Sequence, residues 1–325
     1  MMYKINVNHS LEQVRNLLGS CAAADHLMPI NQEPWTSLSM VPMKNFVENG
    51  WSPESMVEGF EKVLELCQSG KRIYHPLWTQ ALAQKDPTVR VRCLLHFPVE
   101  RKSPFLLLAC GGAYGCVASM IEGYHTCKEI NDLGYHVFLL QYRTGSTAKA
   151  PNPVEDMSAA VRYILENAGE LNVDSVNYAV GGFSAGGHLA ASFGTERNGW
   201  KEYGLPAPVT EVLAYPVITM SSFTHEDSRR NFLQDQADDE KVRDCWSVEK
   251  QVTHGYPATY VWQCEKDKAV PIQNTQMLVE ALKENGVSVE YETFDSECHG
   301  WGGARGTLAE GWPARAVAFW EKQMK

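Results

Sequence analysis

The chain has 325 residues, of which 44% are hydrophobic and 21% charged, and its formal net charge at pH 7 is -10. This length and composition are those of an ordinary globular protein with one large α/β domain and an extension, or with two small domains. The acidic balance, without a basic run longer than a residue or two, argues against a nucleic acid or an anionic membrane surface as partner.

The cysteines and the apolar runs bear on the cellular compartment. Nine cysteines are scattered along the chain without a Cys-x-x-Cys motif, and several lie inside apolar runs. We therefore expect reduced thiols, not a disulfide framework or a zinc site. The N-terminus lacks the apolar core of a signal peptide, and no apolar run approaches the ~20 residues that span a bilayer. These features favour a cytoplasmic protein with no metal and no membrane partner.

Residues 1–86 do not have the pattern of a sheet domain. A capped helix is predicted over 11–18, and a second helix begins after Ser52 and ends at Gly70. The irregular stretch between these helices contains several prolines and, near its end, Trp51. We interpret the region as a helical arm packed on the main domain. The irregular stretch either packs there or covers a pocket.

Residues 87–325 are expected to form the catalytic domain, because short apolar strands alternate there with helices. Residues 105–110 are continuously apolar, as in a strand that is covered on both faces. This order predicts an α/β fold with a mostly parallel sheet and helices on both faces, in which ligands meet the carboxyl ends of the strands. Strands are expected at 89–95, 105–110, 136–142, 176–180, 211–215, 259–264 and 287–294, and helices near 121–133, 154–168, 185–194, 272–285 and 313–323.

Residues 217–256 interrupt this alternation. Polar and charged residues predominate at 221–228 and at 235–241. We predict a partly helical, cap-like excursion above the sheet that helps to shape a pocket. The sequence contains no internal repeat, no phosphate-binding P-loop and no Gly-x-Gly-x-x-Gly motif.

A serine stands at the junction of the strand at 176–180 and the helix that follows it. Gly182-Phe183-Ser184-Ala185-Gly186 fits Gly-x-Ser-x-Gly, in which the glycines relieve the crowding of a sharp strand-to-helix turn. The helix N-terminus and the amide of Ala185 favour the negative charge that develops in acyl transfer. We therefore predict that Ser184 is a nucleophile. The alternative is a glycine-rich turn with a chance serine.

A serine hydroxyl needs a base, usually a histidine that a carboxylate orients. Asp267 and His299 follow the last two predicted strands, in the order serine, acid, histidine that is typical of α/β hydrolases. Glu265 is the nearest competitor for the acid, and His188 is expected to pack or cap within the helix after the serine. The predicted catalytic triad is therefore Ser184, Asp267 and His299.

An oxyanion hole needs two or three backbone N–H groups aimed at the developing negative charge. Gly111-Gly112 directly follows the central strand, where glycines let the backbone approach an ester. We predict that the amides of Gly112, Ala113 and Ala185 form the hole and that Tyr114 borders the pocket and contacts the substrate. The alternatives are a plain turn at Gly111-Gly112 and a packing role for Tyr114.

Taken together, these motifs resemble the α/β-hydrolase esterases of the hormone-sensitive-lipase-like and acetyl-esterase group, above all its acetylxylan or feruloyl esterase branch. The chain departs from the group at Cys110, usually proline or histidine, at Ala113, often a third glycine, and at Lys266, a second aspartate in many relatives. The resemblance covers residues 89–323 and is carried by Cys110-Gly111-Gly112-Ala113-Tyr114, Glu122-Gly123, Gln141-Tyr142-Arg143, the run from Gly182 to Ala191, Tyr215-Pro216-Val217-Ile218, Thr224-His225, Ser228, Asn231, Asp267, Val270-Pro271 and His299-Gly300.

The resemblance implies an α/β-hydrolase fold and a serine carboxylesterase that hydrolyses short acyl esters, above all acetyl esters, on a carbohydrate or an aryl alcohol. It implies no metal and no organic cofactor. The expected partner is a small-molecule or oligosaccharide ester substrate, and the sequence leaves the oligomeric state open, a homo-oligomer included. Two rivals stay open: an amidase or formamidase with the same triad, and a non-catalytic binding protein with the hydrolase fold.

Overall fold

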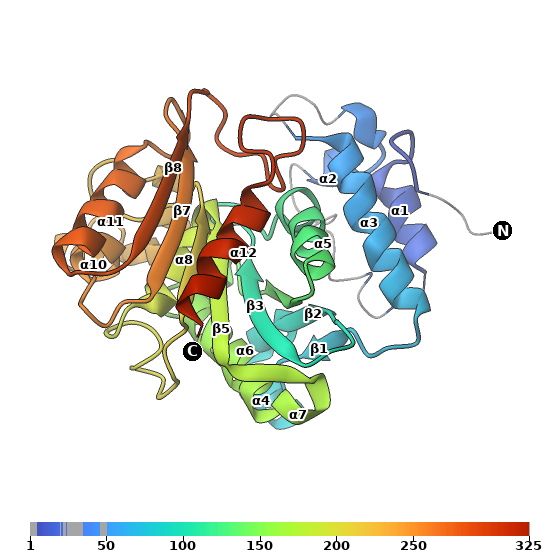
Figure 1. Cartoon of the computed structure of the whole chain (residues 1–325), viewed down its shortest axis with the longest axis horizontal. Helices are drawn as coiled ribbons and strands as arrows, with labels where there is room; N and C mark the ends of the chain where they lie inside the picture. Colours follow the sequence, from blue (N-terminus) through green and yellow to red (C-terminus); the bar gives the residue numbers. More distant parts are fainter. Residues whose placement is uncertain (1–4, 20, 22–23, 25–34, 46–50, 325) are drawn as a thin grey trace.

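A mostly parallel sheet forms the centre of the molecule (Figure 1). The structure is a computed structural model that describes residues 5–19, 21, 24, 35–45 and 51–324. Within these residues, eight strands form one sheet in the order β1-β2-β4-β3-β5-β6-β7-β8. The β1–β2 and β2–β4 pairs are antiparallel and the other pairs are parallel, which confirms the predicted sheet type. The strands are β1 Tyr74–Pro76, β2 Cys93–Phe97, β3 Ser103–Ala109, β4 His136–Gln141, β5 Val173–Phe183, β6 Thr210–Ala214, β7 Ala258–Cys264 and β8 Val289–Phe294.

Helices cover both faces of the sheet, as expected (Figure 1). On one face α5 packs against α12, and on the other face α6 packs against α8, while α11 packs on β7 and β8. This places α8, which follows β5, directly behind the middle of the sheet. The helices are α1 Leu11–Leu18, α2 Trp35–Leu38, α3 Pro53–Gln68, α4 Gln80–Lys85, α5 Tyr124–Asp132, α6 Asn152–Glu166, α7 Ala168–Leu171, α8 Ser184–Gly194, α9 Glu226–Leu233, α10 Glu240–Trp246, α11 Gln273–Glu284 and α12 Trp312–Gln323.

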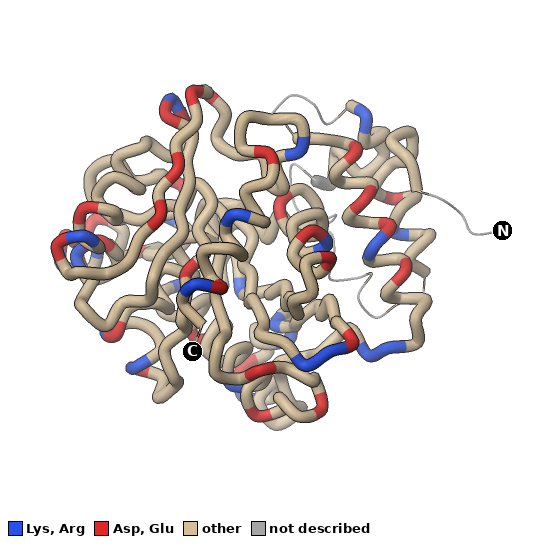
Figure 2. Tube along the Cα trace, viewed as in Figure 1, with Lys and Arg blue, Asp and Glu red and all other residues tan. Residues whose placement is uncertain are grey.

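The centre of the sheet is apolar because its strands are covered on both faces. β3 carries no charged residue, and all but one of its side chains are buried. Phe105 in β3 stacks on Tyr178 in β5, with 5.1 Å between the ring centroids. Figure 2 shows the charged residues distributed mostly over the outer helices and loops. The strands therefore form a rigid platform, and loops at their carboxyl ends are left to carry polar groups.

The N-terminal helices lie on the outer side of α5 (Figure 1). α1 has a capping box at Ser10, and α3 begins with Ser52 as its N-cap, as the sequence predicted. α3 approaches α5 closely at Gly59, where a Cβ would lie only 2.7 Å from the Cβ of Tyr124. Phe60 packs on the same tyrosine, with 5.5 Å between the ring centroids.

Two expectations about strands in this part of the chain are wrong. β1 lies inside the region that we expected to be helical, and it extends the sheet by pairing with β2. The strand expected at 89–95 begins only at Cys93, because Pro87–Val91 forms a 3-10 helix capped by Asp86. Pro87 fixes a helix-compatible φ at the first position of that turn, and this overrides the alternating apolar pattern.

The expectation of reduced thiols is wrong for one pair of cysteines. Cys21 and Cys67 form a disulfide that joins the segment after α1 to the end of α3. The other seven cysteines are free. The expectation of a cytoplasmic location therefore loses the support that it drew from the cysteines.

The excursion at 217–256 contains α9 and α10, so it is partly helical as predicted. Among the described residues, no helix is both long enough and apolar enough to cross a bilayer. The same residues hold no group of three or more His, Cys, Asp or Glu side chains arranged to bind a metal ion.

Candidate active site

Ser184 stands at the sharp turn between β5 and α8, with a left-handed φ of 50°. The two glycines of its motif are required by the packing of this turn. A Cβ at Gly182 would overlap the carbonyl oxygen of Gly186, and a Cβ at Gly186 would overlap the carbonyl oxygens of Ala109 and Cys110. The turn therefore presses the start of α8 against the end of β3. It also holds the serine hydroxyl at the carboxyl edge of the sheet.

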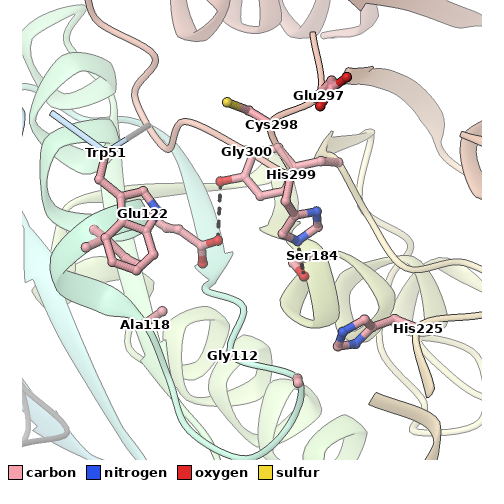
Figure 3. Close-up of a pocket in the computed structure, with 13 residues that line it drawn as sticks. Trp51, Gly112, Ala118, Glu122, Ser184, His225, Glu297, Cys298, His299 and Gly300 are labelled. Atoms are coloured by element: carbon pink, nitrogen blue, oxygen red, sulfur yellow. Dashed lines mark hydrogen bonds between the residues drawn. The ribbon is translucent and has the colours of Figure 1, made fainter. Parts of the chain in front are cut away.

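The structure brings Ser184, His299 and Asp267 together although 115 residues separate the serine from the histidine. The Nε2 atom of His299 lies 2.8 Å from the Oγ of Ser184, a contact that Figure 3 shows as a dashed line. Its Nδ1 lies 2.7 Å from the Oδ2 of Asp267. In the neutral ring Nδ1–H donates to the aspartate, and Nε2 is free to accept the serine proton.

Asp267 is buried and fixed by the loop that follows β7. Its Oδ1 accepts hydrogen bonds from the amides of Ala269 and Val270, both at 2.9 Å, and leaves Oδ2 to face His299. Glu265, the competing acid, is exposed and accepts a hydrogen bond from Thr293 at 2.8 Å. The geometry therefore favours Asp267 as the carboxylate that orients the imidazole.

The loop after β3 carries two of the three predicted oxyanion amides. Gly112 and Ala113 line the pocket with φ values of 119° and 53°, and their amides donate to no group of the described residues. Ala185 supplies the third predicted amide, in the first turn of α8, where the helix dipole favours negative charge. Asn231 of α9 holds the loop from outside by donating to the carbonyl oxygen of Ala113 at 2.8 Å.

Tyr114 does not line the cavity beside Ser184 and His299, although we expected it to border the pocket. The side chain is fully buried and stacks on Phe232 at 4.7 Å between ring centroids. Its hydroxyl donates to the Nδ1 of His188 at 2.7 Å, and the Nε2–H of His188 donates to the carbonyl oxygen of Trp246 at 2.8 Å. Burial lowers the pKa of His188 to about 4, so this imidazole is neutral at pH 7. The φ of 58° at Tyr114 turns the side chain into the core, where it anchors the loop to α8.

A cavity of about 490 Å³ opens above Ser184 and His299. Side chains that sequence reasoning did not assign to the site also line it, among them Trp51, Glu122, His225 and Cys298 (Figure 3). Trp51 comes from the arm, just before α3. The hypothesis that the irregular stretch covers a pocket falls mostly on residues 20, 22–23, 25–34 and 46–50, which lie outside the described residues.

His225 offers a hydrogen-bond donor to the cavity. Its Nδ1 caps α9 by accepting from the Ser228 amide at 3.4 Å, with the Ser228 hydroxyl at 2.9 Å. The proton of the neutral ring therefore sits on Nε2. Burial and the nearby His299 lower the pKa of this imidazole, which favours its neutral form.

Glu122 is a buried carboxyl in the wall of the same cavity. Burial raises its pKa to about 7, against the opposing effects of the Gly111 amide and of His299. Glu122-Gly123 and Thr224-His225 belong to the family resemblance seen in the sequence, but the pattern assigned them no role. An acid within the apolar run from Ala118 to Gly123 is the signal that points to a buried carboxyl.

Comparisons with known proteins identify a matching family and several relatives. The sequence profile of the BD-FAE family matches residues 95–282. The chain is 35% identical over 222 residues to endo-1,4-beta-xylanase B of Butyrivibrio fibrisolvens, and 28% identical over 196 residues to an acetylxylan esterase of Xylanibacter ruminicola. These matches cover 65% and 59% of this chain but only 34% and 40% of the two relatives, so the chain spans little more than a third of their length.

Solved structures with the same fold include enzymes named as hydrolases and esterases. The acetyl ester-xyloside bifunctional hydrolase of Caldicellulosiruptor lactoaceticus matches with a TM-score of 0.69 and 29% identity, over 77% of this chain and 95% of that chain. The carboxylesterase Cest-2923 of Lactobacillus plantarum matches with a TM-score of 0.62 over 71% of this chain and 93% of that chain. At 22% identity, the second match supports the fold alone.

Proposed function

The chain belongs to the BD-FAE family of α/β hydrolases, and on this premise we propose that it is a serine carboxylic ester hydrolase. The observation that carries the proposal is the run of contacts from Ser184 through His299 to Asp267, next to backbone amides at the carboxyl edge of the sheet. A serine hydrogen-bonded to an imidazole, which is in turn hydrogen-bonded to a buried carboxylate, performs acyl transfer on several unrelated folds.

In the proposed mechanism Ser184 Oγ attacks the ester carbonyl while His299 Nε2 takes its proton. The amides of Gly112, Ala113 and Ala185 donate to the oxygen that becomes negative. His299 then protonates the leaving alcohol, and an acyl-enzyme remains on Ser184. A water molecule that gives its proton to His299 hydrolyses this intermediate and restores the serine.

We propose an acetyl or similarly short acyl ester, on a carbohydrate or an aryl alcohol, as the substrate class. The relationship to an acetylxylan esterase supports the acetyl group and the carbohydrate. The cavity supports a polar alcohol, because the Glu122 carboxyl and the His225 imidazole line it together with the indole of Trp51. The arm, through Trp51, would then form part of the substrate site.

The test is hydrolysis of p-nitrophenyl acetate by the purified chain and by Ser184→Ala. We expect the variant to lose at least about a thousandfold in kcat/KM, as loss of one triad member does. The matched control is Ser192→Ala in the same helix, because the Ser192 hydroxyl is buried and makes no hydrogen bond with the described residues. This control is expected to keep full activity. Equal turnover by Ser184→Ala and the wild type would remove Ser184 from the mechanism.

Comparing turnover on several substrates distinguishes the proposed substrate class from the amidase or formamidase hypothesis and from the binding-protein hypothesis. Turnover of p-nitrophenyl acetate and of an acetylated xylo-oligosaccharide above that of p-nitrophenyl octanoate supports the substrate class, and the reverse order contradicts it. Turnover of an aryl formamide above that of every ester would instead support the amidase or formamidase reading. Absence of turnover on all of them, in folded protein, would favour a binding protein with the hydrolase fold.

A further inference from the structure

Glu122 links the oxyanion loop to the loop that carries His299, and we propose that it is a positioning residue that sets the direction of the oxyanion amides. This inference rests on the proposed esterase activity. Glu122 lies in the turn of helix that leads into α5, and its carboxyl is directed toward the site (Figure 3). It belongs to neither of the loops that it joins.

The first contact is made with the loop after β3. The Gly111 amide donates to the Oε2 of Glu122 at 2.6 Å. Because this peptide is turned toward Glu122, the next two amides, of Gly112 and Ala113, are left to face the cavity. The loop has little freedom elsewhere, since a Cβ at Gly111 would lie 2.8 Å from the Cβ of Ser184. Loss of the carboxyl oxygen would leave a buried N–H unpaired and would release the Gly111 peptide from this side chain.

The second contact reaches the base. The Tyr215 hydroxyl accepts from the Gly302 amide at 3.1 Å, so its own O–H donates to the Oε1 of Glu122, at 3.3 Å. The ring of Tyr215 lies edge-on to the imidazole of His299, with 5.1 Å between the centroids. The same ring fills the space beside Gly300, where a Cβ would overlap it. Glu122 and Tyr215 therefore form a brace, which we call the Glu122–Tyr215 brace, from the oxyanion loop to the histidine loop.

The charge of Glu122 is not required for this role. The carboxyl is buried, and the titratable groups around it are Cys110, Tyr142, Tyr215 and His299. Burial raises the pKa of Glu122 to about 7, so both protonation states are populated at neutral pH. A neutral acid keeps a carbonyl oxygen that can accept from the Gly111 amide. An uncharged side chain with the same oxygen should therefore preserve much of the function.

The experiment compares Glu122→Gln, which keeps an oxygen acceptor, with Glu122→Leu, which removes it. We expect Glu122→Leu to lower kcat on p-nitrophenyl acetate about a hundredfold with little change in KM, as a misplacement of about 1 Å does. Glu122→Gln should lose about tenfold or less, which is rescue by the conservative variant. Affinity for a trifluoromethyl ketone, which places a tetrahedral oxyanion in the hole, should fall in parallel with kcat/KM.

The matched control is Glu211→Gln, which neutralises another buried carboxyl, on β6, that does not line the cavity. It should leave kcat unchanged. Tyr215→Phe breaks the Glu122–Tyr215 brace but keeps the ring beside His299, and combining it with Glu122→Gln should cost less than the product of the single losses.

A wild-type kcat in Glu122→Leu, or a loss confined to KM with analogue affinity intact, would overturn the inference. If Glu122→Leu does not fold, full kcat in both Glu122→Gln and Tyr215→Phe overturns it. A parallel loss of kcat and analogue affinity in these two variants supports it. Failure of the wild type to hydrolyse any ester would instead refute the proposed function.

Discussion

Replacing Asp267 by asparagine should reverse the hydrogen bonding of His299. The Oδ1 of Asp267 accepts from two backbone amides, at 2.9 Å each, so the single oxygen of an asparagine will take that position. Its NH₂ group must then face the Nδ1 of His299, which lies 2.7 Å from the present Oδ2. Nδ1 becomes an acceptor, the ring proton moves to Nε2, and Nε2 can no longer take the proton of Ser184.

The expected loss is large because the fold stays intact while the base has the wrong tautomer. A reversal of this kind costs about 10⁴ in kcat, which corresponds to about 5 kcal/mol in the activation free energy. The assay is kcat on p-nitrophenyl acetate at pH 7, with the unfolding midpoint measured beside it. Glu265→Gln is the control, since that exposed carboxylate lies two residues away and contacts Thr293 instead.

Two results would refute this reasoning. Asp267→Asn with a kcat within about tenfold of the wild type would mean that the aspartate does not set the tautomer. A large loss in Glu265→Gln with Asp267→Asn unaffected would transfer the role to the competing acid.

Two further predictions concern backbone packing and a buried charge. Gly186→Ala should lower the free energy of unfolding by about 1–3 kcal/mol and kcat by about a hundredfold. The reason is that the new Cβ would overlap the carbonyl oxygens of Ala109 and Cys110, where the oxyanion loop begins. A wild-type melting temperature and kcat would contradict this. Glu211→Met should stabilise the fold increasingly as pH rises. Burial raises the pKa of Glu211 well above 4.5 in the folded state, and its carboxyl makes no hydrogen bond within the part of the chain that the structure describes. The wild type then loses up to about 1.4 kcal/mol of unfolding free energy per pH unit above the pKa that Glu211 has in the unfolded chain. The urea midpoint of Glu211→Met should therefore exceed that of the wild type by more at pH 8 than at pH 5. An equal difference at both pH values would count against this prediction.

Local sequence pattern was enough to locate most of the sheet, from β3 to β8, and the three residues that meet above it. β3 and β4 are apolar runs, and a strand buried on both faces can be read from such a run without knowledge of its partners. Ser184, Asp267 and His299 each follow a strand, and the carboxyl ends of parallel strands meet at one edge of the sheet. Their meeting was therefore implied by chain order, although their roles still await the tests above.

Features that depend on long-range packing could not be predicted in the same way. β1 has only three residues and forms because β2 offers it an edge. The side chain of Tyr114 turns inward because its backbone has a positive φ. No local sequence pattern predicts this backbone conformation. The position of Glu122 depends on its contacts with Gly111, 11 residues before it, and with Tyr215, 93 residues after it. Its own sequence context shows only an acid in a mostly apolar stretch.

Labelling with a fluorophosphonate, followed by mass spectrometry of the peptides, tests the central claim most directly. An activated serine beside an oxyanion hole attacks this reagent, whereas ordinary serines do not. We predict one adduct, on Ser184, that is lost in Ser184→Ala and strongly slowed in His299→Ala. A protein that hydrolyses esters without an adduct at Ser184, or that carries the adduct on another serine, would contradict the account.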